Sequence, residues 1–413
     1  MQFYEFKETQ ERVILIGVQT EVGDDVEASL DELEELAETA GAETVAKVIQ
    51  NREAVHPGTY IGKGKIEEVA ALIQAYDANG VICDDELSPA QLNNLERELD
   101  CKVMDRTLLI LDIFAARAVS GEGKIQVELA QLKYRASRLA GLGKSLSRLG
   151  GGIGTRGPGE KKLEMDRRLI RERISRLKKE LKDVERHREL IRGQRKQSGL
   201  KVAALVGYTS AGKSSIENAL TQAGVLEDAM LFSTLDTTTR ALTLDNTQEI
   251  LLTDTVGFIN KLPHHLVEAF KSTLEEAKYA DIIVHVVDAS NPQMDAQMHV
   301  VYETLRQLGA EGKPVITLFN KQDKVENPVN HKDLQADYSI ATSAKTGQGL
   351  EEFKHALLEI IRKEQIYIER LYDFSEAGKI QLIRSKGQLL SEEYVPEGIE
   401  VKAYVPQDIY GRL

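Results

Sequence analysis

The 413-residue sequence has no tryptophan, only two cysteines and only 5% aromatic residues. Cys83 and Cys101 are too few for a disulfide framework or a cysteine-rich zinc site, so we expect two half-buried free thiols. Long apolar runs are also absent, because the stretch Leu108–Val119 is interrupted by Asp112 and Arg117. A membrane-spanning helix needs about 20 apolar residues. We therefore expect no transmembrane segment.

The first twelve residues, MQFYEFKETQER, lack the basic and then apolar pattern of a secretory signal. Export is therefore not expected, and cytoplasmic location is the prediction, with peripheral association with a membrane as an alternative. Hydrophobic residues make up 42% and charged residues 29% of the chain, as in ordinary globular proteins. This composition excludes a disordered chain. At about 150 residues per domain, the length predicts two to four domains.

Positive charge is concentrated in one segment of an otherwise acidic chain. The net charge is −13, yet residues 124–196 contain 22 Lys and Arg against 9 Asp and Glu, so the rest of the chain has a net charge of −26. A concentrated basic segment attracts phosphate backbones, and the acidic remainder weakens indiscriminate binding. The segment therefore favours contact with nucleic acid, with a solvated charged helix as the alternative.

Residues 1–122 have the pattern of a small α/β domain. Apolar runs predict strands, and apolar spacings of three and four predict helices. The predicted strands are 13–18, 45–50, 80–84 and 101–104, and the predicted helices are 65–76 and 89–99. Ser88 before Pro89 is a helix-start signal. The turn Gly62–Lys65 opens a helix and could hold an anion, although a plain turn is the interpretation we favour.

Residues 123–196 predict an antiparallel helical hairpin with a glycine-rich tip at 141–160. Apolar residues recur at intervals of four and three over 125–139 and again over 170–191, which is typical of two packed helices. Residues 141–159 contain eight glycines and one proline, in a loop longer than two helices need. Glycine allows close approach to a crowded surface, and basic side chains contact phosphates. With only Tyr134 as an aromatic residue here, base stacking is not the expected mode. The predicted RNA contacts are Lys144, Arg148, Gly151, Gly152, Gly154, Arg156 and Gly157.

Residues 197–365 begin with a phosphate-binding motif. The segment Gly207–Ser214 (GYTSAGKS) fits GxxxxGK[ST], between an apolar strand at 202–206 and a helix predicted from Ser215. Its backbone N–H groups can wrap phosphates, Lys213 can reach the β- and γ-phosphates, and the hydroxyl of Ser214 can bind Mg²⁺. Alone, this motif is compatible with ATPases, kinases and GTPases.

Three further motifs, each at the end of a predicted strand, select GTP. They are Asp254-Thr-Val-Gly257, Asn320-Lys-Gln-Asp323 and Thr342-Ser-Ala-Lys345. Asp254 can hold the outer shell of Mg²⁺, and Gly257 can meet the γ-phosphate. The carboxylate of Asp323 can accept the N1–H and the N2 amine of guanine, and the N–H of Ala344 can donate to guanine O6. Together, the four motifs predict a GTPase.

The predicted nucleotide-binding set comprises the residues of these loops. It contains Gly207, Tyr208, Thr209, Ser210, Ala211, Gly212, Lys213, Ser214, Ser215, Asp254, Thr255, Val256, Gly257, Asn320, Lys321, Gln322, Asp323, Ser343, Ala344 and Lys345. Of these, Lys213 and Gly257 are the predicted catalytic residues. Mg²⁺ is the predicted cofactor.

The switch segment must lie between Ser214 and Asp254. The run 231–240 offers four threonines as Mg²⁺ ligands, and spacing alone does not choose between Thr234, Thr237, Thr238 and Thr239. We expect Arg240 to be a surface residue, with an internal arginine finger as the alternative.

Phe258 occupies the position after the DxxG glycine where Ras-like enzymes have a glutamine that orients the attacking water. A phenyl ring can neither donate nor accept the required hydrogen bond. Hydrolysis is therefore expected to be slow in the isolated protein and to be stimulated by a partner.

The last segment, 366–413, predicts a small α/β domain. Its residues Ile399, Val401, Ala403 and Val405 alternate with more polar ones, as in a half-buried strand. The predicted fold class is therefore multidomain α/β: a small α/β domain with a long helical hairpin, a P-loop GTPase domain and a small C-terminal domain.

The sequence resembles the HflX family of ribosome-associated GTPases. The resemblance rests on the run Gly150–Glu160 (GGGIGTRGPGE), on GYTSAGKS, on TLDTTTR at 234–240 and on DTVGFI at 254–259, in the family's order along the whole chain. It implies binding to the large ribosomal subunit, with the hairpin tip near the peptidyl-transferase centre. It also implies splitting or rescue of stalled or dormant ribosomes under stress.

The resemblance also implies specific roles. Thr234 becomes the expected switch ligand of Mg²⁺ and a third catalytic residue, and the nucleotide is lined by Phe232, Ser233, Thr234, Leu235 and Asp236. ATP binding by the N-terminal domain has been considered for the family, and here only the Gly62–Lys65 turn hints at it. The expected partners are GTP, GDP, the ribosome and its large-subunit RNA, without DNA. The free protein is expected to be a monomer.

Three residues depart from the family pattern. Ser210 replaces an asparagine that helps hold the monovalent ion in potassium-activated relatives, which puts dependence on K⁺ in doubt. Thr237 replaces a proline in the switch and is expected to loosen it. Glu217 replaces a phenylalanine and is expected to expose or recharge one face of the P-loop helix.

Two other functions are compatible with the residues. One is a regulatory G protein that acts on a protein effector without binding RNA. The other is an RNA-binding or remodelling module in which GTP only stabilises the fold. Salt-sensitive ribosome binding that needs Arg156 would argue against the first, and equal ribosome binding with GTP and GDP would favour the second.

Overall fold

The computed structural model describes residues 11–20, 25–146, 158–198, 200–221, 231–232, 238–245, 248–261, 271–325 and 331–413. The fold is multidomain α/β, as predicted. The chain divides into two compact units. The first contains 1–184, 229–235 and 260–271, and the second contains 185–228, 236–259 and 272–413.

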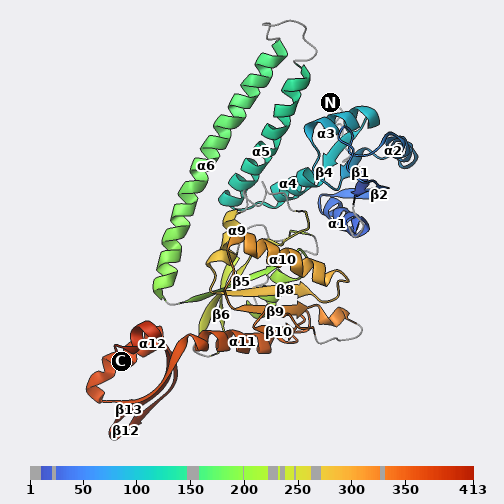
Figure 1. Cartoon of the computed structure of the whole chain (residues 1–413). Coiled ribbons are helices and arrows are strands. Elements are labelled where there is room, and N and C mark those ends of the chain that lie inside the picture. The colour runs from blue at the N-terminus through green and yellow to red at the C-terminus, as the bar shows by residue number, and fades with distance from the viewer. Residues whose placement is uncertain are drawn as a thin grey trace, which may run out of the picture. The chain divides into compact units, whose positions relative to one another are not determined.

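The first unit contains a four-stranded parallel sheet in the order β2-β1-β3-β4 (Figure 1). Its elements are β1 (Glu11–Gln19), α1 (Val26–Thr39), β2 (Ala42–Asn51), α2 (Lys63–Tyr76), β3 (Gly80–Cys83), α3 (Pro89–Leu99), β4 (Lys102–Asp105) and α4 (Arg106–Arg117). Apolar side chains of β1 and β3, such as Ile14, Ile16 and Val81, are fully buried against the helices. Helix α3 starts where the sequence predicts, because Ser88 and Gln91 form a reciprocal capping box.

The same unit contains helix α5 (Gly121–Leu146) and most of helix α6 (Pro158–Ser198), which lie side by side in Figure 1. Arg173 Nε and Nη2 donate to Glu128 at 2.6 and 2.8 Å, and Arg167 donates to the carbonyl of Leu139. Arg173 of α6 pairs with Glu128 of α5, and the earlier residue Arg167 pairs with the later residue Leu139. The two helices are therefore antiparallel. Leu177 of α6 is buried.

The loop predicted between the two helices is shorter than expected. Helix α5 continues through Gly141 to Leu146, and α6 begins at Pro158, inside the predicted tip, and ends at Ser198. Glycine in a helix costs only about 1 kcal/mol, and proline is favoured at a first helical position. Extending a helix that already exists is therefore easy here.

No helix in the described part of the chain is long and apolar enough to span a membrane.

The second unit contains a six-stranded sheet in the order β10-β9-β8-β5-β7-β6, in which only β6 is antiparallel to its neighbour. Its elements are β5 (Lys201–Gly207), α7 (Lys213–Thr221), β6 (Thr238–Thr243), β7 (Glu249–Asp254), α9 (Lys271–Tyr279), β8 (Ile282–Asp288), α10 (Met294–Leu308), β9 (Val315–Asn320), η1 (Gln322–Lys324), β10 (Tyr338–Ala341) and α11 (Leu350–Lys363). Helix α7 begins at Lys213, two residues before the predicted start. The carboxyl ends of β5, β7, β9 and β10 meet at one edge of the sheet, where an open α/β sheet binds its ligand.

The C-terminal segment forms an antiparallel sheet in the order β11-β13-β12 (Figure 1). Its elements are β11 (Gln365–Tyr372), η2 (Phe374–Glu376), α12 (Ala377–Lys386), β12 (Gln388–Val395), β13 (Gly398–Pro406) and α13 (Gln407–Tyr410). As the alternation predicts, Ile399, Val401, Ala403 and Val405 of β13 are buried.

Candidate nucleotide site

The loop between β5 and α7 requires glycine at two positions. A Cβ on Gly207 would lie 2.2 Å from the carbonyl oxygen of Val286. Gly212 has a φ of +94°, and a Cβ there would lie 2.4 Å from Nδ2 of Asn320. Ser210 is exposed and has a φ of +59°, in the left-handed region that disfavours most side chains. The loop is therefore packed tightly against two neighbouring strands.

Lys213 is buried at the start of α7, and its ammonium donates to the carbonyl oxygens of Gly207 at 3.2 Å and Tyr208 at 3.1 Å. Burial lowers the pKa of Lys213 to about 8, although the charge of Asp254 acts in the opposite direction. The charge of Asp254 and the two carbonyl oxygens thus compensate only part of the cost of burying this ammonium group. Phosphate oxygens beside it would stabilise the charged form.

We expect nucleotide affinity to fall about tenfold between pH 7 and pH 9, because the free protein loses the Lys213 proton over this range while the phosphate-bound form keeps it. Binding of a fluorescent GDP derivative as a function of pH measures this. The Lys213→Arg variant, whose guanidinium stays charged, should lose the pH dependence whatever its absolute affinity. A flat profile in the parent, or an equally steep one in the variant, would contradict the assignment.

Ser214 and Asp254 form a hydrogen-bonded pair of oxygen groups beside the P-loop. Asp254 is buried at the end of β7, and Ser214 Oγ donates to its Oδ2 at 2.8 Å. Strand pairing of Leu205 with Asp254 brings the two motifs together, and Thr255 Oγ1 anchors the loop by donating to the carbonyl of Leu205 at 2.7 Å. A hydroxyl and a carboxylate are the hard ligands that Mg²⁺ prefers. The residues present therefore fit this ion.

The backbone after Asp254 lies directly on the P-loop. The N–H of Phe258 donates to Gly207 O at 3.1 Å, and the N–H of Thr209 donates to Phe258 O at 2.8 Å. A Cβ on Gly257 would lie 2.9 Å from Thr209 Cα and 3.0 Å from Lys213 Nζ. The Phe258 ring is buried. Phe258 thus contacts the P-loop through its backbone, and Gly257 must be glycine because the chains approach so closely.

The two guanine motifs are joined to the P-loop by one side chain. Asn320 Nδ2 donates to Ala211 O at 2.9 Å, and Asn320 Oδ1 accepts the N–H of Ala344 at 3.0 Å. Asn320 is buried at the end of β9. The Asn320 side chain therefore connects the P-loop with the two guanine motifs and fixes the distances between these three loops.

Asp323 is oriented by Ser343, whose Oγ donates to Asp323 Oδ1 at 2.7 Å. This hydrogen bond holds the pKa of Asp323 below its ordinary value, so the side chain is an anion at neutral pH. Lys321 has a φ of +62°, and its ammonium pairs with Asp288 Oδ2 at 2.6 Å. The aligned carboxylate can accept two N–H groups of a guanine ring.

Glu217 is buried on α7, contrary to the expectation that it exposes or recharges a helix face. Its Oε2 accepts the hydroxyl of Thr238 at 2.9 Å and lies 3.6 Å from Nε of Arg240. Burial and the nearby charge of Asp254 raise the pKa of Glu217 to about 7, against the effects of Thr238 and Arg240. Arg240 is half-buried on this carboxyl rather than freely exposed.

The other predicted residues of these loops follow the same four strand ends: Ser215, Val256, Gln322 and Lys345. Phe232 is described and buried. Ser233, Thr234, Leu235, Asp236 and Thr237 lie outside the described residues, as do Arg148, Gly151, Gly152, Gly154, Arg156 and Gly157. Lys144 is in α5, within the stretch predicted to be loop.

The sequence analysis did not predict the buried contacts of Glu217 and gave no role to Asp288. Asp288 ends β8 at the same sheet edge as the motifs, and this position was the available signal. Glu217 gave a weaker signal, a single acidic residue four positions after the motif lysine.

Comparisons with known proteins agree with this geometry. Family models described as "GTP-binding GTPase N-terminal", "GTP-binding GTPase Middle Region" and "50S ribosome-binding GTPase" match residues 27–115, 117–195 and 202–321. A GTPase HflX of Lacrimispora saccharolytica is 64% identical over 409 residues, which cover 99% of this chain and 97% of the relative. A GTPase HflX of Escherichia coli is 39% identical over 401 residues, which cover 96% of this chain and 91% of the relative.

Among solved structures, a GTP-binding protein from the archaeon Sulfolobus solfataricus in complex with GDP is 25% identical, with a TM-score of 0.45 over 86% of this chain and 99% of that one. The full-length identity to curated relatives, together with four guanine-nucleotide motifs at one sheet edge, leads to one conclusion: this chain belongs to the HflX family of GTPases.

Proposed function

We propose that this GTPase binds RNA of the large ribosomal subunit through the α5–α6 hairpin and its tip, and that it splits or rescues stalled or dormant ribosomes under stress. The observation that carries the proposal is the net charge of +13 over 124–196 in a chain whose net charge is −13. On α6, Lys178, Lys179 and Lys182 are exposed and available to phosphates. The family model for a 50S ribosome-binding GTPase supports the same partner.

In the proposed nucleotide complex, backbone N–H groups of Gly207–Ser215 surround the phosphates, and Lys213 neutralises charge on the β- and γ-oxygens. Asp323 selects guanine by accepting two N–H groups, and the hydroxyl of Ser343 holds its carboxylate in place before the base arrives. The N–H of Ala344 donates to Asn320 Oδ1 in this structure and would turn to guanine O6 when the base is bound. Asn320 also holds the P-loop beside this motif through Ala211. Preorganisation of this kind lowers the cost of binding.

Ser214 would bind Mg²⁺ directly, Asp254 would hold its outer shell, and Thr234 would be the switch ligand. The ion, when bound, would neutralise charge on the bridging and terminal phosphate oxygens. The protein contributes a hydroxyl already 2.8 Å from a buried carboxylate.

Hydrolysis should be slow in the isolated protein. The N–H of Gly257 can approach the γ-phosphate, but the buried ring of Phe258 offers no group to orient the attacking water. A partner must supply or order that group. We propose that the ribosome does so, and that hydrolysis then releases the protein.

Sedimentation through a sucrose gradient tests the proposal. With a slowly hydrolysed GTP analogue we expect co-migration with the large subunit and a shift of intact ribosomes toward subunits, whereas GDP should give much less of both. Added ribosomes should also raise the rate of GTP hydrolysis.

The triple variant Lys178→Glu/Lys179→Glu/Lys182→Glu should bind ribosomes at least about tenfold more weakly, because its charges repel phosphates. The matched control reverses three exposed lysines outside the hairpin, Lys63, Lys332 and Lys386, with the same change in net charge. Equal loss in both variants would indicate a general charge effect. Absence of ribosome binding with every nucleotide would instead favour a protein effector.

A further inference from the structure

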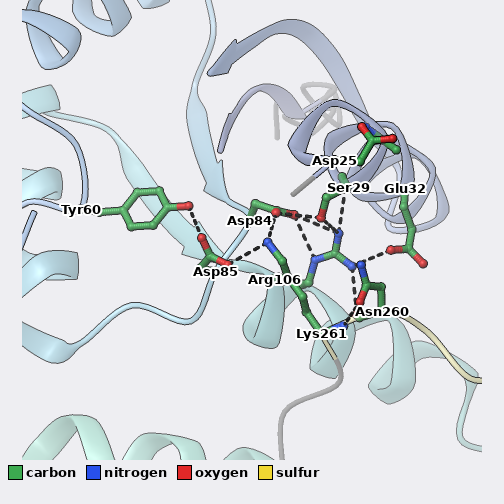
Figure 2. A network of polar contacts seen from close by, with 10 residues as sticks. Asp25, Ser29, Glu32, Tyr60, Asp84, Asp85, Arg106, Asn260 and Lys261 are labelled. Carbon is green, nitrogen blue, oxygen red and sulfur yellow. Dashed lines mark hydrogen bonds and ion pairs between the residues drawn. The ribbon is translucent and has the colours of Figure 1, made fainter. Parts of the chain in front are cut away.

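A buried polar network in the first unit surrounds Arg106, the first residue of α4 (Figure 2). Only 1% of Arg106 is exposed. Its Nη2 donates to Asp84 Oδ1 at 2.9 Å and to the carbonyl of Ser29 at 2.8 Å. Its Nη1 donates to Glu32 Oε2 at 3.0 Å and to the carbonyl of Asn260 at 3.3 Å. Arg106 thus connects the N-terminal sheet with a residue far along the chain.

Lys261 enters the same network (Figure 2). Its ammonium donates to Asp84 Oδ2 and, at 2.8 Å, to Asp85 Oδ1, while Asp85 Oδ2 accepts the hydroxyl of Tyr60 at 2.6 Å. Burial alone would raise the pKa of Asp84, but Arg106 and Lys261 hold it below its ordinary value. Three carboxylates, those of Glu32, Asp84 and Asp85, therefore pair with two cations, Arg106 and Lys261, and Asp84 pairs with both.

The network lies at the ligand-binding position of a doubly wound sheet. Asp84 follows β3, and Ser29 lies on α1, which follows β1; these two strands are neighbours in the order β2-β1-β3-β4. Connections leave β1 and β3 toward opposite edges, and ligands bind at such a point beside the carboxyl ends of the strands. At this position, Arg106 of α4 and Lys261 from much later in the chain both pair with Asp84, and Lys261 also pairs with Asp85.

The position of Lys261 in the chain links Asp84 and Asp85 to the nucleotide site. Asn260 and Lys261 belong to the first unit, yet they follow Gly257 by three and four residues. Phe258, which lies between Gly257 and Asn260 in the sequence, is hydrogen-bonded through its backbone to the P-loop. Lys261 also has a φ of +52°, a strained value for a residue with a side chain. The network holds this strained turn in place.

The segment before the switch threonines is held in the same unit. Phe232 packs edge-on against Phe114 of α4, with 4.6 Å between ring centroids, and the N–H of Leu231 donates to Thr39 Oγ1 at 3.3 Å. Phe232, which precedes the predicted switch threonines, and Lys261, which follows the Asp254–Gly257 motif, therefore both contact residues of the N-terminal domain.

We propose that Lys261 is a positioning residue for the GTPase cycle: bound to Asp84 and Asp85, it retains the segment after Gly257 in the arrangement in which Phe258 O occupies the N–H of Thr209. A γ-phosphate between Thr209, Lys213 and Gly257 competes for that N–H. GTP must therefore draw the segment away from Asp84 and Asp85, whereas GDP, which has no γ-phosphate, leaves Lys261 bound to them. This pair of carboxylates is thus the part of the N-terminal domain that distinguishes the two nucleotides.

The test compares nucleotide affinities without ribosomes, so its result is independent of the proposed ribosomal role. Lys261→Met removes the charge and keeps most of the stem. Relative to the parent, we expect the ratio of affinities for a slowly hydrolysed GTP analogue and for GDP to rise about tenfold, within the usual range of coupling between sites. Asp85→Asn should shift the ratio in the same direction, and the double variant should shift it no further than Lys261→Met.

Lys47→Met is the matched control, because Lys47 also bridges two carboxylates of this unit, Asp31 and Glu34, each at 2.6 Å. Thermal unfolding verifies that every variant is folded. An unchanged or reduced ratio in Lys261→Met would overturn the proposal. So would an equal shift in Lys47→Met, because a structural ion pair would then be sufficient.

Discussion

Replacing Asp323 by asparagine is expected to weaken GTP and GDP binding about 100-fold, because two charge-assisted hydrogen bonds to the guanine ring are lost together. The structure adds a geometric reason. Ser343 Oγ donates to Asp323 Oδ1, so in the variant the amide oxygen faces Ser343 and the NH₂ group faces the N1–H and N2 amine of guanine. The NH₂ group of the asparagine then faces N–H groups of guanine, so no hydrogen bond can form between them. Isothermal titration with GDP measures the loss.

The same change should favour a base that has an acceptor in place of the N2 amine, so xanthosine diphosphate should lose far less affinity, or gain it. Asp295→Asn is the control, since Asp295 is exposed on α10 and the net charge changes equally. An equal loss for both bases would indicate that the loop had collapsed, and unchanged GDP affinity would remove Asp323 from the guanine site.

Replacing Glu217 by glutamine is expected to stabilise the protein above neutral pH. In the folded protein the pKa of Glu217 is raised to about 7, whereas an unfolded glutamate titrates near 4.5. Below pH 4 both states are protonated and the residue has no pH-dependent effect. As the pH rises toward 8, the unfolded state gains the more favourable ionisation, so folding loses up to about 3 kcal/mol from this carboxyl.

Glu217→Gln resembles the protonated side chain and can still accept the hydroxyl of Thr238. Urea unfolding of the nucleotide-free protein should therefore give nearly equal free energies for parent and variant at pH 4. At pH 8 the variant should be the more stable by up to about 3 kcal/mol. Glu249→Gln, an exposed change on β7, is the control. A difference that does not vary with pH would contradict the raised pKa.

The nucleotide site was largely predictable because its chemistry is local. Each motif is a short run directly after an apolar strand, and parallel strands bring their carboxyl ends to one edge. Residues as distant in the chain as Ser214 and Asp254, or Ala211 and Asn320, therefore meet without any further information. Capping and alternation are local in the same way, and they placed α3 and β13.

The helix ends of the hairpin and the buried charge pairs could not be predicted from the sequence. The ends of the hairpin helices were misplaced, because glycine is a signal of turns although its cost inside a helix is small. Burial of Glu217 depends on what packs over α7, and Thr238 and Arg240 reach it from β6. The pairing of Lys261 with Asp84 spans 177 residues of sequence, and no spacing rule connects them.

The sequence by itself determined the family, the GTPase class and the concentration of positive charge in one segment, and it predicted the phosphate and guanine contacts, because these depend on residue type and short-range spacing. Only the tertiary structure decided which charges are buried and what surrounds them: Glu217 near the like charge of Asp254, Lys213 on carbonyl oxygens, and Lys261 paired with Asp84 beside Arg106. The reason is physical. The free energy of a charge depends on its desolvation and on partners from distant parts of the chain.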